Sequence, residues 1–202
     1  MGKKLIKYTV SVYTENSVGL LNRISAIFQR RHINIESFNS SMTEIENVQR
    51  WTILVITYES LIKKIVGQIN KQIEVIKAYY HTDEETIYQE SCLFKIKSSL
   101  LFDDRKIQNI IKESNAIIVT VNPEFFVLEK SGRTHELDEL YEKLNKYGIL
   151  QYVRSARIAV TKAPLMISEI LTDLKKNNTI SVIILIHLTN QRKNHSCLSV
   201  DL

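Results

Sequence analysis

The spacing of hydrophobic residues switches between two periods along the chain, and the order of the switches predicts the fold. Residues 5–13 alternate apolar and polar side chains, as expected for a strand with one buried face. Residues 20–28 instead carry apolar side chains at helical spacing. The same two periods predict three further strands, over residues 32–43, 49–58 and 73–82, and one further helix, over residues 61–69. The first part of the chain therefore has the order β-α-β-β-α-β.

The same order of elements recurs after a polar stretch, residues 83–90, which is predicted to be a linker. The later elements are strands over residues 92–98, 116–121, 125–130 and 149–160, and helices over residues 107–111 and 135–147. Two successive split βαβ units are typical of the ferredoxin-like arrangement. We therefore expect an α+β fold with two ferredoxin-like βαββαβ domains, over residues 3–82 and 91–162.

Residues 163–202 are expected to be a C-terminal extension of unknown role. Its pattern predicts a helix over residues 165–176, a strand-forming run over 180–188 and a disordered polar end from 191. The most apolar run, residues 181–188, is too short to span a membrane as a helix. The first residues lack the apolar core of a signal peptide, so a cytoplasmic location is expected.

The net charge of +5 raises nucleic-acid binding as a hypothesis. The densest basic clusters, at residues 30–31, 63–64 and 175–176, are expected on helix faces that contact water. No basic strand is flanked by aromatic residues in the way that RNA-binding sheets require. A nucleic-acid-binding module is therefore the less favoured interpretation.

An independent enzyme is the least favoured hypothesis, because no catalytic or metal-binding arrangement is evident. The five histidines lie far apart, and no phosphate-binding glycine motif occurs among only five glycines. Cys92 and Cys197 show neither the spacing of a zinc site nor a disulfide framework. We assign no catalytic residue, no metal ligand and no cofactor to this chain.

The most distinctive segment is the first strand-to-helix turn, residues 15–24. Gly19 is expected in the first helical turn, where the absence of a Cβ allows close approach to the helix N-terminus. Free N–H groups and the helix dipole make that N-terminus a receptor for a carboxylate, and Asn16 offers a further polar contact. Alternatively, Asn16 or Ser17 is simply the N-cap and Gly19 is a permissive residue. The spacing alone leaves both interpretations open.

A second informative segment follows the first helix. Asn34 satisfies turn backbone and Ile35 packs in the core under the simpler interpretation. Under the alternative interpretation, both residues face the first strand-to-helix turn of a second protomer. Asn34 is then a polar anchor and Ile35 an apolar wall.

These segments together resemble the small, regulatory subunits of acetolactate synthase (acetohydroxyacid synthase). The resemblance rests on ENxxGxLxR at 15–23 and FxxRxxNIES at 28–37, and later on FKI at 94–96, ExSG at 129–132 and RSAR at 154–157. It covers roughly residues 3–162. Trp51 departs from the family pattern, in which smaller apolar residues are usual, and residues after Lys162 match nothing recognised.

The resemblance implies that residues 3–82 form an effector-binding ACT domain that pairs with a second copy. Members of that family bind valine, leucine or isoleucine, activate a large catalytic subunit and confer feedback inhibition in branched-chain amino-acid biosynthesis. Thiamine diphosphate, Mg²⁺ and FAD belong to the catalytic subunit. The implied effector-binding residues are Asn16, Gly19, Leu20 and Leu21 of one protomer with Asn34 and Ile35 of its partner.

Two questions stay open from the sequence. One methylene group changes affinity by only ~1–3 kcal/mol, so the choice among the three amino acids is not determined. A free-standing ACT-type amino-acid sensor, acting on transcription or on another enzyme, is the alternative function.

Overall fold

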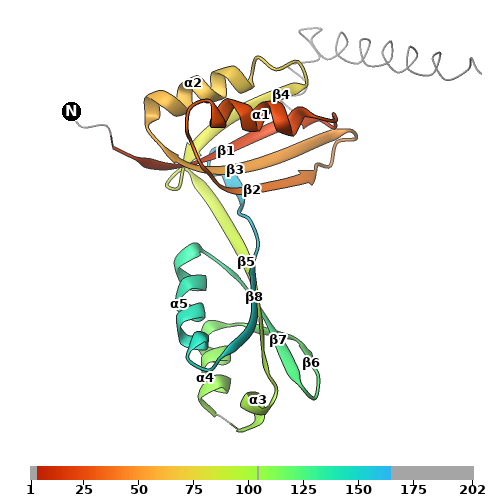
Figure 1. Cartoon of the computed structure of the whole chain (residues 1–202), viewed down its shortest axis with the longest axis vertical. Helices are drawn as coiled ribbons and strands as arrows, with labels where there is room; N and C mark the ends of the chain where they lie inside the picture. Colours follow the sequence, from red (N-terminus) through yellow and green to blue (C-terminus); the bar gives the residue numbers. More distant parts are fainter. Residues whose placement is uncertain (1–3, 104, 165–202) are drawn as a thin grey trace, which may run out of the picture.

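The first half of the chain is a four-stranded antiparallel sheet covered on one face by two helices (Figure 1). The computed structural model describes residues 4–103 and 105–164. The strand order is β2-β3-β1-β4. The elements are β1 (Ile6–Glu15), α1 (Leu20–Gln29), β2 (Ile35–Met42), β3 (Val48–Thr57), α2 (Glu59–Ile69) and β4 (Val75–Thr82).

The alternation along β1 separates the two faces of this sheet. Tyr8, Val10 and Val12 are buried in the core beneath the helices. α1 contributes Leu20 and Phe28 to that core, because positions spaced at helical periods share one face. The opposite face of the sheet is polar, and a segment of the second half covers it.

The second half repeats the topology of the first. Its strand order is β6-β7-β5-β8, which is the same permutation of successive strands. The predicted α+β fold of two ferredoxin-like units is therefore confirmed. The elements are β5 (Thr86–Lys97), α3 (Ser99–Asp103), α4 (Arg105–Ser114), β6 (Ile117–Val121), β7 (Phe125–Gly132), α5 (Thr134–Asn145) and β8 (Ile149–Arg154). The short helix α3 was not expected from the sequence.

The two halves are joined by strands rather than by a loop (Figure 1). Residues 83–90 were expected as a linker, but β5 begins at Thr86 and continues to Lys97. The first part of β5 pairs with β9 (Ile158–Thr161), and its second part pairs with β7 and β8. We call the paired segments 86–89 and 158–161 the connecting ribbon. The expected linker is therefore wrong as a description of this segment.

The single strand expected over residues 149–160 is also wrong, because residues 155–157 separate β8 from β9. Ser155 and Ser91 bind each other at this point, through Ser155 N to Ser91 O and Ser91 N to Ser155 Oγ, both at 2.8 Å. Beyond the break the chain leaves the second sheet and crosses the first, so the two strands take different partners.

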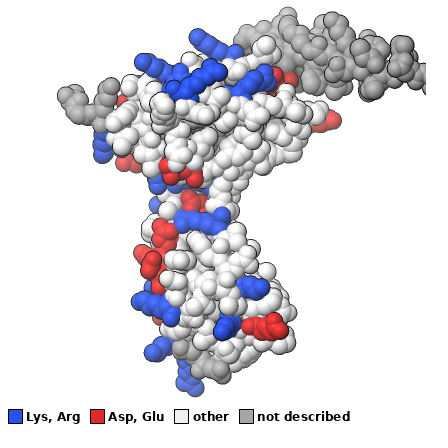
Figure 2. Space-filling model, viewed as in Figure 1, with Lys and Arg blue, Asp and Glu red and all other residues white. Residues whose placement is uncertain are grey.

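Of the predicted basic clusters, the pair on α2 lies on an exposed helix face, whereas residues 30–31 follow the end of α1 and Arg31 is only partly exposed. Figure 2 shows Lys and Arg side chains over the helical layer of the first half. Lys63 and Lys64 are exposed on α2, and Arg30 is exposed at the end of α1. The cluster at 175–176, and all elements predicted after residue 164, lie outside the described residues. Within 4–103 and 105–164, no helix is long and apolar enough to cross a membrane.

Candidate functional site

The first candidate site is the turn between β1 and α1. Gly19 is the N-cap of α1 and has a left-handed backbone with φ +82°. The expected placement of Gly19 inside the first helical turn is therefore wrong, as is the proposal of Asn16 or Ser17 as N-cap. A positive φ favours glycine, because a Cβ strains that conformation.

The helix N-terminus behind Gly19 is open. Apart from its chain neighbours, no described residue has a heavy atom within 4 Å of the position that a Cβ on Gly19 would take. Among the described residues, α1 has no side-chain cap hydrogen bond and no Asp or Glu in its first turn. The Leu20 N–H donates to the Ser17 carbonyl at 3.4 Å, but the next N–H groups and the positive dipole end of α1 are available to an anion.

Asn16 is oriented by a chain of hydrogen bonds from the sheet. The Trp51 indole N–H donates to Gln49 Oε1 at 3.1 Å, and Gln49 Nε2 donates to Asn16 Oδ1 at 2.9 Å. The indole nitrogen is only a donor, so it determines which way both amides face. Asn16 therefore presents its Nδ2 donor to the outside. The unusual Trp51 is the first member of this chain.

The two leucines of the turn have different surroundings. The Leu20 side chain is fully buried in the core, so this residue offers no side-chain contact to a ligand. The Leu21 side chain is 46% exposed next to the open helix N-terminus. Val18, at the tip of the turn, is fully exposed.

Asn34 and Ile35 lie at the opposite end of the first sheet. Ile35 pairs with Val55 of β3, whereas Glu15, just before the turn, pairs with Val48. Seven residues of extended strand separate these positions by about 23 Å. Asn34 is exposed, and Ile35 is partly buried against the core. One chain therefore does not bring Asn34 close to Asn16.

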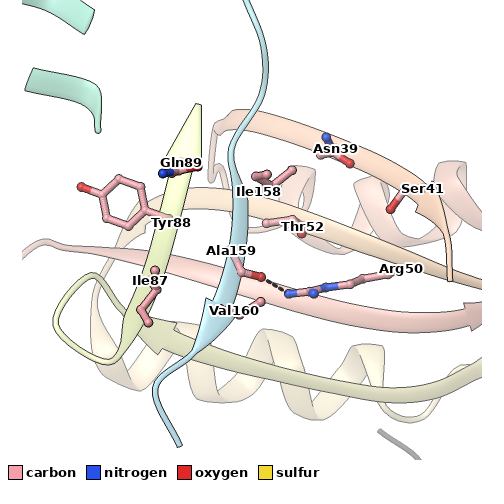
Figure 3. Close-up of a pocket in the computed structure, with 10 residues that line it drawn as sticks. All are labelled: Asn39, Ser41, Arg50, Thr52, Ile87, Tyr88, Gln89, Ile158, Ala159 and Val160. Carbon is pink, nitrogen blue, oxygen red and sulfur yellow. Dashed lines mark hydrogen bonds between the residues drawn. The ribbon is translucent and has the colours of Figure 1, made fainter. Parts of the chain in front are cut away.

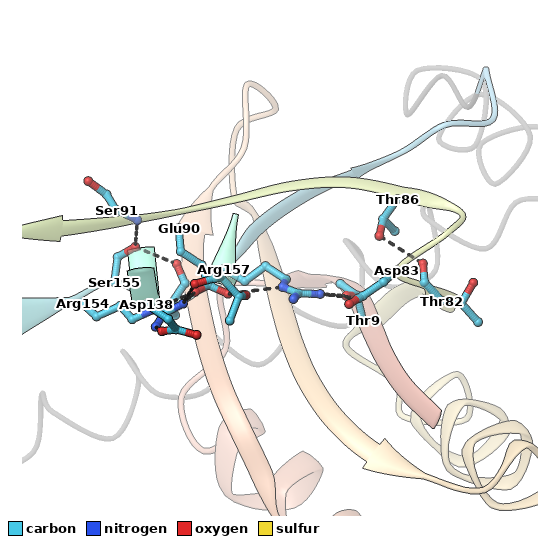
Figure 4. Close-up of polar contacts among 12 residues, drawn as sticks. Thr9, Thr82, Asp83, Thr86, Glu90, Ser91, Asp138, Arg154, Ser155 and Arg157 are labelled. Atoms are coloured by element: carbon cyan, nitrogen blue, oxygen red, sulfur yellow. Dashed lines mark hydrogen bonds and ion pairs between the residues drawn. The ribbon is translucent and has the colours of Figure 1, made fainter. Parts of the chain in front are cut away.

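A second notable site lies where the two halves meet, and the sequence analysis assigned it no role (Figure 4). Arg157 is only 1% exposed. Its Nη1 donates to Asp83 at 2.6 Å and to Thr9 Oγ1 on β1 at 3.2 Å. Its guanidinium carbon is 3.5 Å from the centroid of the Tyr88 ring, in a cation–π contact.

Glu90 extends this contact into the second half. Glu90 Oε1 is 3.6 Å from Arg157 Nε, and Glu90 Oε2 accepts from Arg154 Nε at 2.8 Å. Arg154 also binds Asp138 of α5 at 2.6 Å. Burial lowers the pKa of Arg154, but hydrogen bonds to Asp138 and Glu90 outweigh burial and leave that pKa raised. We call Thr9, Asp83, Glu90, Asp138, Arg154 and Arg157 the junction network.

One signal in the sequence does point to the junction network. Both arginines belong to the RSAR segment that contributed to the family resemblance, and Arg157 lies in an otherwise strand-like run. A charged residue that strand periodicity places among apolar neighbours is a candidate for a buried ion pair. The partners of Arg157, however, are distant in the sequence: Glu90 lies 67 positions away and Thr9 lies 148 positions away.

In residues 4–103 and 105–164, no group of three or more His, Cys, Asp or Glu side chains is placed to hold a metal ion. Cys92 is buried, and burial raises the pKa of its thiol despite a 3.2 Å contact with the Tyr152 hydroxyl. Burial and the contact with Cys92 in turn raise the pKa of Tyr152 to about 12.

Comparisons with known proteins agree on one family. A family model described as "Small subunit of acetolactate synthase" matches residues 89–163, and one described as "AHAS small subunit-like ACT domain" matches residues 10–77. The acetolactate synthase small subunit of Mycobacterium bovis is 31% identical over 160 residues, which cover 78% of this chain and 93% of that protein. The Bacillus subtilis small subunit is 31% identical over 158 residues, which cover 78% of this chain and 91% of that protein.

A solved structure shows the same fold. The crystal structure of the acetolactate synthase small subunit from Thermotoga maritima superposes with a TM-score of 0.70 and 22% sequence identity. The match covers 79% of this chain and 99% of that one. The shared architecture thus extends over both ferredoxin-like units.

Proposed function

Because this chain belongs to the family of acetolactate synthase small subunits, we propose that it activates a large catalytic subunit and confers feedback inhibition by valine. Leucine and isoleucine are the other candidate effectors. The observation that carries the effector site is the open N-terminus of α1, with Gly19 as its N-cap and the Asn16 donor beside it. Thiamine diphosphate, Mg²⁺ and FAD belong to the large subunit in this proposal.

The turn suits the carboxylate end of an amino acid. The N–H groups of α1 and the Asn16 Nδ2 are all donors, and a carboxylate accepts from donors on both oxygens. The exposed Leu21 side chain supplies an apolar contact for a branched side chain. The ammonium group of the amino acid needs an acceptor from elsewhere. We propose that this acceptor is the side-chain carbonyl oxygen of Asn34 in a second copy.

A second copy reaches the turn if two β2 strands pair. β2 is an edge strand, so one row of its N–H and C=O groups is open to pairing. Antiparallel pairing of two β2 strands places the start of one, at Ile35, next to the end of the other, at Met42. Met42 pairs with Gln49, which holds Asn16, so Asn34 of one copy approaches the turn of the other.

Exposed apolar side chains at that end support the pairing. Val18, Leu21 and Met42 are 102%, 46% and 55% exposed, and all lie at the turn end of the first sheet. A second copy that covers them removes apolar surface from water. The effector pocket is then shared, and valine binding is coupled to how two copies are arranged.

The first test is reconstitution with the large subunit from the same organism. We expect the purified chain alone to form no acetolactate from pyruvate, to raise the activity of the large subunit on mixing, and to make that activity sensitive to valine. Acetolactate formation by the chain alone would contradict the proposal. Failure to bind the large subunit would instead favour the free-standing amino-acid sensor.

A mixing experiment tests whether the pocket is shared. Gly19→Asp and Asn34→Ala chains should each lose inhibition by valine when assayed alone with the large subunit. A mixed dimer contains one pocket with both changes and one with neither. Random mixing of equal amounts makes half of the dimers mixed, so it should restore inhibition to about a quarter of all pockets. Unmixed Gly19→Asp and Asn34→Ala samples at the same total concentration are the controls. Without any recovery on mixing, the shared pocket is wrong.

A further inference from the structure

A hollow of about 340 Å³ lies on the polar face of the first sheet, beside the connecting ribbon (Figure 3). Asn39 and Ser41 of β2 and Arg50 and Thr52 of β3 form its floor. The connecting ribbon forms its wall with Ile87, Tyr88, Gln89, Ile158, Ala159 and Val160. It is on the face of the sheet opposite α1 and α2, so it is separate from the turn at Gly19.

Arg50 gives the hollow a positive charge that the described residues do not neutralise. Its Nη2 donates to the Ala159 carbonyl and reaches Ser11 Oγ at 3.5 Å. Its Nε is buried and has no acceptor among the residues that the structure describes. None of the ion pairs found in 4–103 and 105–164 includes Arg50, and the residues that line the hollow include no Asp or Glu. A buried N–H without an acceptor costs free energy that an anion would recover.

The rest of the floor is polar and the wall is apolar. Asn39 and Thr52 face each other across the β2–β3 ladder, as do Ser41 and Arg50. Ile87, Ile158 and Val160 are each more than half exposed on the ribbon. A ligand that fits both surfaces has an anionic end for Arg50 and an apolar part for the ribbon.

We propose that this hollow binds a small carboxylate with a short apolar chain. The carboxylate accepts from Arg50 and from the polar floor, and the chain packs on the isoleucine side chains of the ribbon. A hollow of this size is at the lower end of the range for small-molecule sites. A ligand in it contacts both the first sheet and the ribbon that leads to the second half, so it is a second ligand site beyond the effector turn.

Hexanoate is a suitable probe, with inorganic phosphate and hexylammonium as comparison compounds. We expect calorimetry on the full chain to show saturable hexanoate binding with a dissociation constant below about 1 mM. Valine should compete with hexanoate only weakly, because its ammonium group would lie close to the Arg50 guanidinium, and the Gly19→Asp chain should bind hexanoate equally well. The hexanoate result therefore does not depend on the proposed effector turn. Hexylammonium should not bind, because its charge is opposite.

Two variants test the location. Arg50→Met removes the charge but also the contact with Ala159, whereas Asn39→Phe fills the hollow and leaves Arg50 in place. Aromatic residues are well tolerated in strands, so the second variant should fold. Each variant should weaken hexanoate binding at least about tenfold. The control is Arg30→Met, which changes an exposed arginine at the end of α1 and should leave hexanoate binding unchanged. Binding of phosphate but not hexanoate, no saturable binding, or full binding by both variants would each overturn the proposal.

Discussion

Replacing Gly19 by Asp should abolish feedback inhibition and leave activation of the large subunit intact. The Asp side chain places a negative charge at the N-terminus of α1, where the effector carboxylate is proposed to bind. Among the described residues the new Cβ meets no neighbour, and Asp adopts a positive φ at a cost of only about 1 kcal/mol, so the fold should survive. We expect the inhibition constant for valine to rise at least about 100-fold, equivalent to about 2.7 kcal/mol.

Gly19→Asn is the matched control for this change. Asn has nearly the size of Asp and carries no charge, and both residues tolerate a positive φ better than other residues, at a cost of about 1 kcal/mol. We expect Asn to weaken inhibition much less than Asp. The measurement is acetolactate synthase activity of the reconstituted complex against valine concentration. If Asp and Asn raise the inhibition constant equally, the carboxylate does not approach this turn. Loss of activation together with inhibition would show that Gly19 has a structural role.

Replacing Arg157 by Met should destabilise the chain by about 3 kcal/mol, because the change breaks a buried ion pair from one side. Asp83 and Glu90 both lose a cation, and Thr9 on β1 loses its donor. The cation–π contact with Tyr88 is lost as well. Equilibrium unfolding in urea, monitored by circular dichroism, measures the change in the free energy of unfolding.

Arg23→Met is the comparison variant. Arg23 pairs with Glu74, and its side chain is 48% exposed. An exposed pair contributes little, so we expect a loss below about 1 kcal/mol. Equal losses for the two variants would mean that the junction network adds no stability beyond that of a surface pair. A double variant, Arg157→Met with Asp83→Asn, should cost less than the sum of the two changes, since the residues interact directly.

The sequence by itself determined most of the elements and their order, apart from α3 and the division of the last predicted strand into β8 and β9. The alternation in residues 5–13 and the helical spacing in 20–28 each describe a local backbone geometry, and β1 and α1 follow them within a few residues. The repeated order of elements also implied the repeated topology, because short connections leave few ways to pair four strands. The motif around Gly19 identified the turn.

The details of that turn required the tertiary structure. The sequence placed Gly19 in the helix, whereas the structure has it before the helix with a positive φ. The orientation of the Asn16 amide depends on Gln49 and Trp51 in β3, 33 and 35 positions further along the chain. The separation of Asn34 from Asn16 depends on the register of β2 and β1 against β3. None of these three features can be predicted from the spacing of hydrophobic residues in a local segment.

The connection between the two halves was decided by tertiary contacts alone. Residues 83–90 are polar enough to predict a loop, but only residues 83–85 form a turn, and residues 86–89 belong to β5 because β9 provides a partner strand for them. The break at 155–157 arises where the chain passes from one sheet to the other. The residues on both sides of the break favour strands, so the sequence pattern does not reveal this change of partner. Arg157 bonds to Thr9, 148 positions away, and a local pattern reports burial and period but not which distant side chain completes a buried ion pair.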